Sequence, residues 1–344
     1  MIRFNNDYNH GAHPAILEAL TQTNSESYGG YGLDEWCEKA SAEIKKHLDC
    51  PKATIHFMVG GTQTNFTVIS AVLRPYQSVI AASTGHIYAH ETGAVEATGH
   101  KVEPLLSQDG KLTAAQIAEK AESYRTSHVQ EHIPQPKLVY ISHPTEYGTI
   151  YSKQELEDIR IVCDRYGLFL YVDGARMGYG LGSPESDVTL ADFARLTDIF
   201  YIGGTKCGAL FGEAVVIPNP LLQPDFRSYI KQKGGMLAKG WLLGLQFHTL
   251  FKDDLYLNIT KKAVTLAMKL RDAFAQKKIP AYVHSPTNQQ FVVLTKQQMD
   301  TLAKKYIFEF EQQLTDDLVC VRFCTSWCTT EAEADALVAD IQAL

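Results

Sequence analysis

The chain has 344 residues, of which 45% are hydrophobic and 21% charged, with a formal net charge of −7. This composition is typical of a soluble globular enzyme, and its acidic balance argues against nucleic acid or an anionic membrane as the main partner. No apolar stretch approaches the roughly 20 residues of a membrane span, and the N-terminus lacks the apolar core of a signal peptide. Seven cysteines without a CxxC pair predict reduced thiols in a cytoplasmic protein and no metal site.

Three regions follow one another along the chain. Residues 1–33 are irregular apart from a helix expected over 14–21, so we expect an N-terminal arm that lies on another surface. Residues 34–250 alternate apolar strands with helices, which predicts a large domain with a mostly parallel sheet covered on both faces. Residues 251–344 are expected to form a smaller α/β domain.

The expected elements can be placed from apolar periodicity and from residues that begin or end helices. Asp34 is expected to cap a helix, and further helices are expected to end near residue 73 and to cover 114–125, 153–166, 226–251 and 254–278. Strands of the large domain are expected over 54–59, 78–82, 101–105, 137–142, 168–172, 199–202 and 213–217. Strands of the small domain are expected over 280–284, 290–294, 306–311 and 319–325, before a closing helix over 331–344.

Polar or glycine-rich turns follow five of the predicted strands. In an open parallel sheet, ligands bind at the carboxyl ends of the strands, so these turns are expected to meet at one edge. Reading just past each strand end gives this set: Gly61-Thr62, His86, His143, Asp173 and Lys206.

Asp173 and Lys206 together suit pyridoxal phosphate (PLP). This cofactor needs a lysine to hold its aldehyde and an acid that keeps its pyridine nitrogen protonated. Taken singly, Asp173 could cap the next helix and Lys206 could be a solvated loop lysine. Their pairing at two strand ends favours the cofactor.

The remaining candidates each have a functional and a structural interpretation. Gly60-Gly61-Thr62 lies between a strand and a helix and could bind a phosphate or form a plain tight turn. His86 could stack on the pyridine ring or be a solvated loop histidine, and His143 is a candidate general base. Arg176 could reach the cofactor's phenolic oxygen or lie on the surface. Arg322, within an apolar strand, could grip a substrate carboxylate or form an internal salt bridge.

Taken together, these motifs resemble the L-threonine aldolase family of fold-type I PLP enzymes, within the threonine aldolase and β-eliminating lyase group. The likeness extends over nearly the whole chain, and its most specific parts are the DGAR turn at Asp173–Arg176 and the following Lys206. Further matching segments are Asn6-Asp7, Tyr31-Gly32, Gly60–Asn65, His86-Ile87, Glu91–Ala94, Tyr147–Thr149, Gly204-Thr205 and Arg322–Trp327.

The resemblance implies a fold-type I PLP-dependent transferase-like fold with a smaller C-terminal α/β domain. It implies cleavage of L-threonine, L-allo-threonine or an aromatic β-hydroxy-α-amino acid to glycine and an aldehyde. A β-eliminating lyase acting on an aromatic or sulfur amino acid is the alternative. A homodimer or homotetramer with shared active sites is also implied.

Site roles follow from the same resemblance. It implies a Schiff base on Lys206, ring protonation by Asp173 and Arg176 at the phenolic oxygen. Gly61 and Thr62 are implied at the phosphate, where Lys231 or Lys239 could replace the family's usual arginine. The remaining implied contacts are His86 against the ring, and Arg322, Asn6, Tyr31 and His143 on the substrate side, with Tyr31 a candidate for contribution across the subunit interface.

Overall fold

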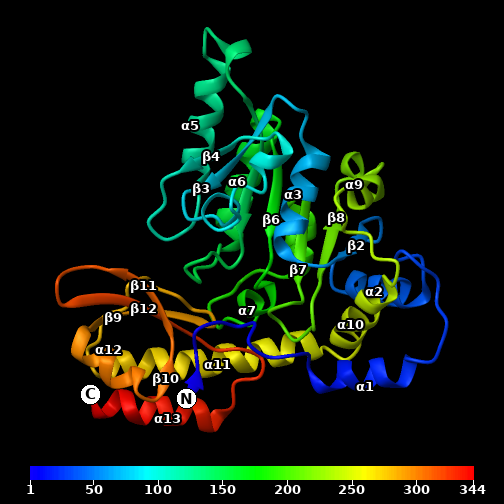
Figure 1. The fold of residues 1–344 in the computed structure, drawn as a ribbon. Helices are drawn as coiled ribbons and strands as arrows, with labels where there is room; N and C mark the ends of the chain where they lie inside the picture. Colours follow the sequence, from blue (N-terminus) through cyan, green and yellow to red (C-terminus); the bar gives the residue numbers. More distant parts are fainter.

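A seven-stranded sheet forms the centre of the larger domain in the computed structural model, which describes residues 1–344 (Figure 1). Its strands are β2 (Thr54–Met58), β3 (Gln77–Ala82), β4 (Val102–Leu105), β5 (Gln135–Ser142), β6 (Phe169–Asp173), β7 (Ile199–Gly203) and β8 (Glu213–Ile217). The spatial order is β2-β8-β7-β6-β5-β3-β4, and β8 alone runs opposite to the other six strands. The mostly parallel sheet predicted from the apolar runs is therefore confirmed.

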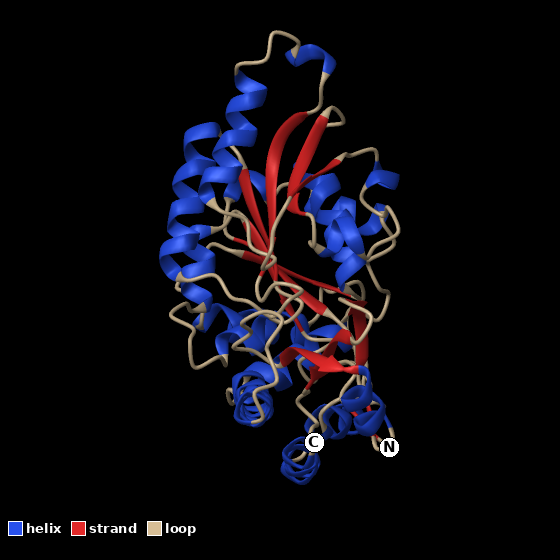
Figure 2. Ribbon diagram, turned by 90° about the vertical axis from the view of Figure 1, so that its left-hand side faces the viewer, coloured by secondary structure: helices blue, strands red, loops and turns tan.

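Helices cover both faces of this sheet, as Figure 2 shows. In β6, Leu170 and Val172 face one apolar cluster while Tyr171 faces the other, because successive side chains of a strand point to opposite faces. The first cluster is covered by α5 (Ala114–Arg125), α6 (Lys153–Tyr166) and α8 (Leu190–Leu196). The second is covered by α3 (Gly61–Val72), α4 (His86–Ala89) and α9 (Phe226–Gln232).

The helical stretch expected over 226–251 is two helices rather than one. Helix α9 ends at Gln232, and α10 begins only at Trp241 and ends at Phe251. Gly234, with a φ of +76°, adopts a left-handed conformation that favours glycine and interrupts the helical path. Helix α10 packs against α2 (Glu35–Lys46), which Asp34 caps by accepting a hydrogen bond from the Cys37 N–H.

The smaller domain contains a three-stranded antiparallel sheet in the order β11-β12-β9. Its strands are β9 (Gln289–Thr295), β11 (Glu309–Gln313) and β12 (Leu318–Cys324), flanked by α12 (Lys296–Ala303) and α13 (Glu331–Ala343). The strand expected over 280–284 is wrong: only Ala281 forms an isolated bridge, to Val292. Pro280 has no N–H to donate to a ladder, so a continuous strand is unfavourable there. Helix α12 was not expected from the sequence.

The N-terminal arm connects the two domains. Its first residues form β1 (Ile2–Arg3), which pairs in parallel with β10 (Tyr306–Ile307), and Phe4 is fully buried in the core of the smaller domain. Helix α1 (Pro14–Thr23) packs against α10 at the larger domain. A separate arm over residues 1–33 stays a prediction, because its first residues belong to the sheet and core of the smaller domain.

Helix α11 (Leu255–Gln276) contributes to the cores of both domains. Tyr256 and Val264 belong to a cluster of the larger domain, whereas Leu270 and Phe274 belong to that of the smaller one. A division of the chain near residue 250 therefore stays a prediction. The short α7 (Met177–Leu181) packs against α11 beneath the sheet edge, and short 3-10 turns cover Glu96–Thr98, Gln130–His132 and Pro220–Leu222.

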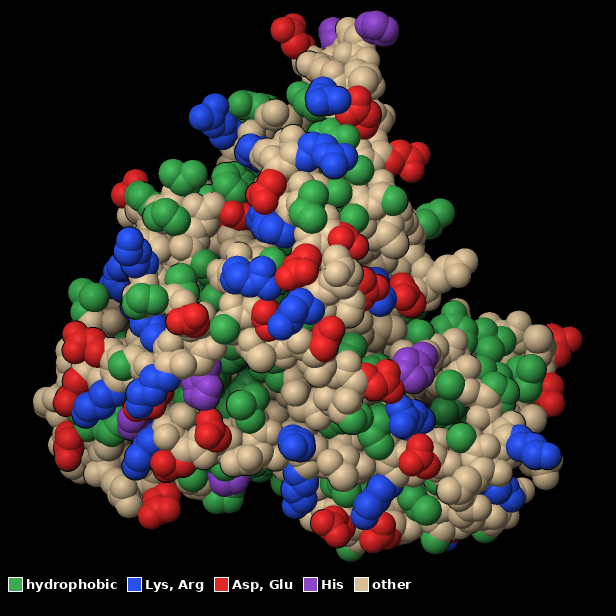
Figure 3. Space-filling model, turned by 180° about the vertical axis from the view of Figure 1, so that it is seen from behind, with side chains coloured by type: hydrophobic (Ala, Val, Ile, Leu, Met, Phe, Trp, Pro, Cys, Tyr) green, Lys and Arg blue, Asp and Glu red, His purple; other side chains and the backbone are tan.

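The surface carries acidic and basic side chains side by side, as the face drawn in Figure 3 shows. No single-sign patch dominates this face, which agrees with the small excess of 39 acidic over 32 basic residues. None of the helices combines the length and apolarity needed to cross a membrane.

Candidate active site

A cavity of about 240 Å³ opens at the edge of the large sheet where five strands end. Strand β2 runs in the direction of β7 because both pair antiparallel with β8, so the turn after β2 reaches this edge as well. The lining includes six residues expected from the sequence: Gly61, Thr62, His86, Asp173, Arg176 and Lys206. The remaining candidates, Asn6, Tyr31, His143 and Arg322, do not line it.

Asp173 sits at the end of β6 and is only 4% exposed. Its carboxylate accepts hydrogen bonds from the hydroxyls of Tyr140 (2.6 Å) and Tyr201 (2.5 Å) and from the side-chain amide of Asn65 (3.0 Å). Burial alone would raise the pKa of Asp173, but His86 and the two tyrosine hydroxyls outweigh burial and hold the pKa below its usual value. The group therefore stays a carboxylate at neutral pH.

His86 begins α4 and is held by a buried carboxylate. Its Nδ1 lies 2.8 Å from Oε1 of Glu91, and the same oxygen accepts a hydrogen bond from Asn65. Burial lowers the pKa of His86, whereas Glu91 and Asp173 raise it, and the net pKa lies above the usual value. A fixed imidazole thus forms one wall of the cavity.

Lys206 follows β7, and its amine lies in the interior of the site. The Tyr179 hydroxyl donates to the Lys206 carbonyl at 2.6 Å, and the amine lies 5.9 Å from the centre of the Tyr8 ring. Burial and the neighbouring Arg176 guanidinium lower the pKa of the amine. A lysine with a lowered pKa is more often neutral and is therefore a better nucleophile.

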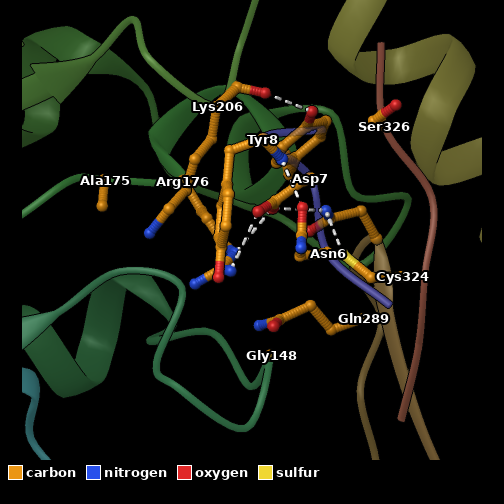
Figure 4. Close-up of polar contacts among 12 residues, drawn as sticks. Asn6, Asp7, Tyr8, Gly148, Ala175, Arg176, Lys206, Gln289, Cys324 and Ser326 are labelled. Atoms are coloured by element: carbon orange, nitrogen blue, oxygen red, sulfur yellow. Dashed lines mark hydrogen bonds and ion pairs between the residues drawn. The ribbon is translucent and has the colours of Figure 1, made fainter. Parts of the chain in front are cut away.

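Arg176 is bound by the N-terminal arm (Figure 4). Its Nε and Nη2 donate to the two carboxylate oxygens of Asp7 at 2.7 and 3.0 Å, and Asn288 of the smaller domain also donates to Asp7 at 2.9 Å. The Asp7 side chain is fully buried. Its pKa, which burial would raise, is lowered by Arg176 and Lys206. The arm thus supplies the negative charge that balances Arg176. From the sequence, this guanidinium is a candidate hydrogen-bond donor to the phenolic oxygen of the cofactor.

The first turn of α3 is suited to a phosphate. Helix α3 begins at Gly61, and Gly60 before it offers no side chain to cap the free N–H groups. A β-carbon on Gly61 would lie 3.2 Å from the Tyr201 hydroxyl, so a larger residue would crowd this wall. Neither Lys231 nor Lys239 lines the cavity, and the Lys231 amine lies 4.8 Å from the Tyr31 ring centre.

His143 does not face the cavity, which conflicts with the expectation of a general base. The side chain is fully buried, its Nδ1 accepts from the Tyr151 N–H at 3.3 Å, and its ring packs 4.9 Å from that of Phe193. The neighbouring Ser142 lines the cavity, and alternation at the end of β5 turns the next side chain to the opposite face. Burial lowers the pKa of His143 to about 3, so the ring is neutral.

Arg322 lies in β12, next to the arm. Its Nη2 donates to the Asn5 carbonyl at 3.2 Å and its Nη1 to Oε1 of Gln289 at 3.3 Å, while Glu311 lies 3.4 Å from Nε. Nε itself is buried without a hydrogen-bond partner. The guanidinium is therefore only partly satisfied by the protein.

The other two substrate candidates lie outside the cavity of this single chain. Asn6 accepts a hydrogen bond from the Tyr8 N–H at 3.0 Å. Tyr31 is 47% exposed, has a φ of +62° and borders a different cavity beside α2 and α10.

Several polar residues of the site were not expected from the sequence. Tyr140 and Tyr201 could have been found from strand alternation, because each lies on the cavity face of a strand next to that of Asp173. Glu213 begins β8, the antiparallel strand, at the same edge, where it accepts from Thr205 and from the Gly204 N–H. Burial raises the pKa of Glu213 to about 8. The residues missed at this edge are Asn65, Glu91, Tyr140, Glu146, Tyr201 and Glu213.

The fold and the buried carboxylate–lysine pair define an α/β enzyme of the fold-type I PLP class, as the resemblance predicted. The family model described as beta-eliminating lyase matches residues 8–320, so the chain belongs to this family.

Relatives with known names show which members of this family the chain is similar to. A low specificity L-threonine aldolase from a Pseudomonas species is 30% identical over 354 aligned positions, covering 99% of this chain and 97% of that protein. The structure of a threonine aldolase from Leishmania major matches with a TM-score of 0.97 and 45% identity, covering 100% and 99% of the two chains. A serine palmitoyltransferase from Sphingomonas wittichii has a TM-score of 0.73 at 12% identity over 99% and 86%, which is a likeness of fold alone.

Proposed function

We propose that this protein is a PLP-dependent aldolase that cleaves L-threonine, L-allo-threonine or an aromatic β-hydroxy-α-amino acid to glycine and an aldehyde. The observation that carries the proposal is the buried pair of Asp173 and Lys206 at the ends of neighbouring strands β6 and β7. The relatives named threonine aldolase supply the reaction.

The residues of the cavity fit the cofactor. Lys206 would hold its aldehyde carbon, Asp173 would keep its ring nitrogen protonated, and His86 would lie against the ring. The free N–H groups at Gly61 and Thr62 would bind the phosphate. Arg176, already oriented by Asp7, has Nη1 left to donate to the phenolic oxygen. When bound, PLP withdraws electrons from a bond at the substrate's Cα.

The substrate carboxylate is assigned to Arg322, whose two Nη groups each keep one N–H beyond the hydrogen bonds that they make in the protein. Asn6 of the arm lies next to Asn5, which already contacts Arg322. Tyr31, which is exposed and remote from the cavity of its own chain, is assigned to the site of a partner subunit. The proposal thus includes a homodimer or homotetramer with shared sites, active in the cytoplasm.

β-Elimination from an aromatic or sulfur amino acid is the second candidate. The family description favours it, since it names eliminating lyases. The two reactions use the same cofactor contacts and differ in the bond that breaks.

Product analysis separates the two candidates. We expect the purified protein to show a near-visible absorbance band that borohydride bleaches, and to convert threonine or phenylserine into glycine plus an aldehyde. Release of keto acid and ammonia, without glycine, would replace the aldolase by the eliminating lyase. A colourless protein that binds no PLP would overturn both.

A further inference from the structure

Glu146 lies in the turn after β5 and lines the same cavity as Lys206 and Asp173. Its Oε1 accepts a hydrogen bond from the Ser142 hydroxyl at 2.7 Å and another from the His86 N–H at 2.9 Å. Its Oε2 is buried and has no hydrogen-bond partner in the protein. A buried carboxyl oxygen without a partner is costly, so its retention in a cavity indicates a ligand contact.

The position of Glu146 relates it to the substrate. Its carboxyl contacts the backbone of His86, the residue assigned to the cofactor ring. Its backbone carbonyl accepts from Nε2 of Gln289 at 3.3 Å, and Oε1 of the same glutamine accepts from Arg322 at 3.3 Å. Glu146 is therefore linked to both the ring-facing residue and the residue assigned to the substrate carboxylate. The substituents on the substrate's α-carbon must lie between those two anchors.

The surroundings of Glu146 favour its protonated form more than water does. Burial raises the pKa of Glu146, the Ser142 hydroxyl lowers it, the Asp173 carboxylate raises it and His86 lowers it, and the net pKa lies above the usual value. Of the two histidines at this edge, His143 is turned into the core and His86 is assigned to stacking on the cofactor ring. Among the carboxylates that line the cavity, Glu146 is the one with an oxygen that has no hydrogen-bond partner.

We propose that Glu146 accepts the proton of the hydroxyl on the substrate's Cβ. This inference rests on the proposed function and names the base for it. As Oε2 takes the proton, the O–H electron pair becomes the second bond of the aldehyde C=O. The Cα–Cβ bond breaks and its electron pair stays with the glycine fragment. One proton leaves the hydroxyl and one is added to Cα, so glycine and the aldehyde together contain every atom of the substrate.

The test compares Glu146→Gln with a matched control, Glu103→Gln. Glu103 is also a buried glutamate that accepts from a serine hydroxyl, that of Ser78, but it lies on β4 outside the cavity. In the holoenzyme, Glu146→Gln is expected to lower kcat for threonine cleavage about 10²–10⁴-fold, the range of a positioned general base. PLP content and exchange of glycine's α-proton, which need no Cβ base, should match those of the parent. Glu103→Gln should change none of these quantities.

The pH profile tests proton transfer rather than packing. The base must be deprotonated to act, so the parent's rate should fall as pH drops through the raised pKa of Glu146, and this acidic limb should vanish in Glu146→Gln. Asp173 and His86, the charged groups facing Glu146, are unchanged in the variant, so any limb that they cause should persist in both proteins.

Thermal unfolding supplies a measurement that does not depend on turnover. A carboxyl whose folded pKa is raised contributes stability below its unfolded pKa of about 4.3, and this contribution is lost as pH rises through the folded pKa. The parent's Tm should therefore fall more steeply than that of Glu146→Gln as pH rises above the unfolded pKa.

Two outcomes would overturn the inference. Cleavage at the parent's rate in Glu146→Gln would exclude Glu146 as the base. Equal loss of cleavage, glycine exchange and PLP content would assign it to holding the cofactor instead. If the parent protein releases no glycine from threonine, the proposed function itself is wrong. If the parent cleaves threonine and Glu146→Gln is equally active, only the assignment of Glu146 is wrong.

Discussion

Asp173 in the larger domain and Arg322 in the smaller one are both charged residues near the site, but the protein satisfies them to different degrees. Asp173 accepts four hydrogen bonds of 2.5–3.0 Å, three from side chains and one from the Ala175 N–H. Arg322 makes two hydrogen bonds of 3.2–3.3 Å and leaves Nε without one. The comparison teaches that Asp173 is fixed by short hydrogen bonds before any ligand arrives, whereas Arg322 is held by longer hydrogen bonds and by an ion pair with Glu311.

Removing Lys206 tests whether the edge that contains Asp173 holds a cofactor at all. Lys206→Ala should yield a protein without a borohydride-reducible chromophore and with turnover lowered by about 10⁴-fold or more, the usual consequence of losing a covalent catalytic group. Absorbance spectra and a glycine-release assay would check this. Lys39→Ala, at an exposed ion pair with Glu35, is the control. A chromophore still attached to the chain in Lys206→Ala would disprove the assignment.

Breaking the Asp7–Arg176 pair tests whether the arm belongs to the prearranged part of the site. Asp7→Asn leaves a buried guanidinium without its counter-charge, and we expect a loss of about 3–5 kcal/mol in the free energy of unfolding. The Asp7 pKa is lowered, so its stabilising contribution is present above its unfolded pKa and is lost as pH falls through the folded one. The deficit should therefore be largest at neutral pH and shrink in acid.

Denaturant unfolding at pH 7 and at a pH well below the usual aspartate pKa of about 3.9 would measure the Asp7→Asn effect. Glu35→Gln, which removes an exposed pair, is the control and should cost less than about 1 kcal/mol. A deficit for Asp7→Asn as small as the control's would show that the arm contributes little to stability.

Asp173→Asn removes the charge but keeps the shape of the fixed anchor. Turnover should fall about 10²–10³-fold, the typical effect of losing one preorganised electrostatic group, while PLP remains bound. Steady-state kinetics and PLP content would check this, with Asp187→Asn as the surface control. Near-parental turnover would remove Asp173 from the reaction.

Arg322→Lys tests the role of Arg322, the second residue of the comparison. A lysine cannot reproduce the planar pair of donors, so KM for threonine should rise about 10–100-fold, corresponding to about 1.5–3 kcal/mol for a charge-assisted bond. Arg195→Lys, at an exposed ion pair with Glu157, should leave KM unchanged. If Arg322→Lys instead lowers stability and spares KM, then Glu311 is the partner that matters.

The strand ends were predictable, and the side chains around them only in part. Apolar runs located every strand of the large sheet, and parallel topology then delivered Thr62, His86, Asp173 and Lys206 to one edge. The direction of His143 was missed because a one-residue step along a strand end reverses the face of a side chain, and strand ends are uncertain by one or two residues.

Contacts made by the arm were not predictable from local pattern. Asp7 and Asn288 are 281 positions apart, and the sequence around neither residue indicates that the two form a hydrogen bond. Glu146 was also missed, since a glutamate in a turn ordinarily lies in solvent; only the fold shows that its Oε2 is buried.

The crossing of the arm over both domains has a consequence for the order in which the protein matures. Asn5 and Arg322 are joined by a hydrogen bond that spans 317 positions, and Asp7 contacts Arg176 across 169. During synthesis Asn5 and Asp7 emerge well before Arg322, which is made only with β12. A nascent chain that stops short of β12 can form the large sheet but not the complete site. Catalytic competence should therefore arise only after β12 has been made, because closing so long a loop must follow the folding of the domains that it joins.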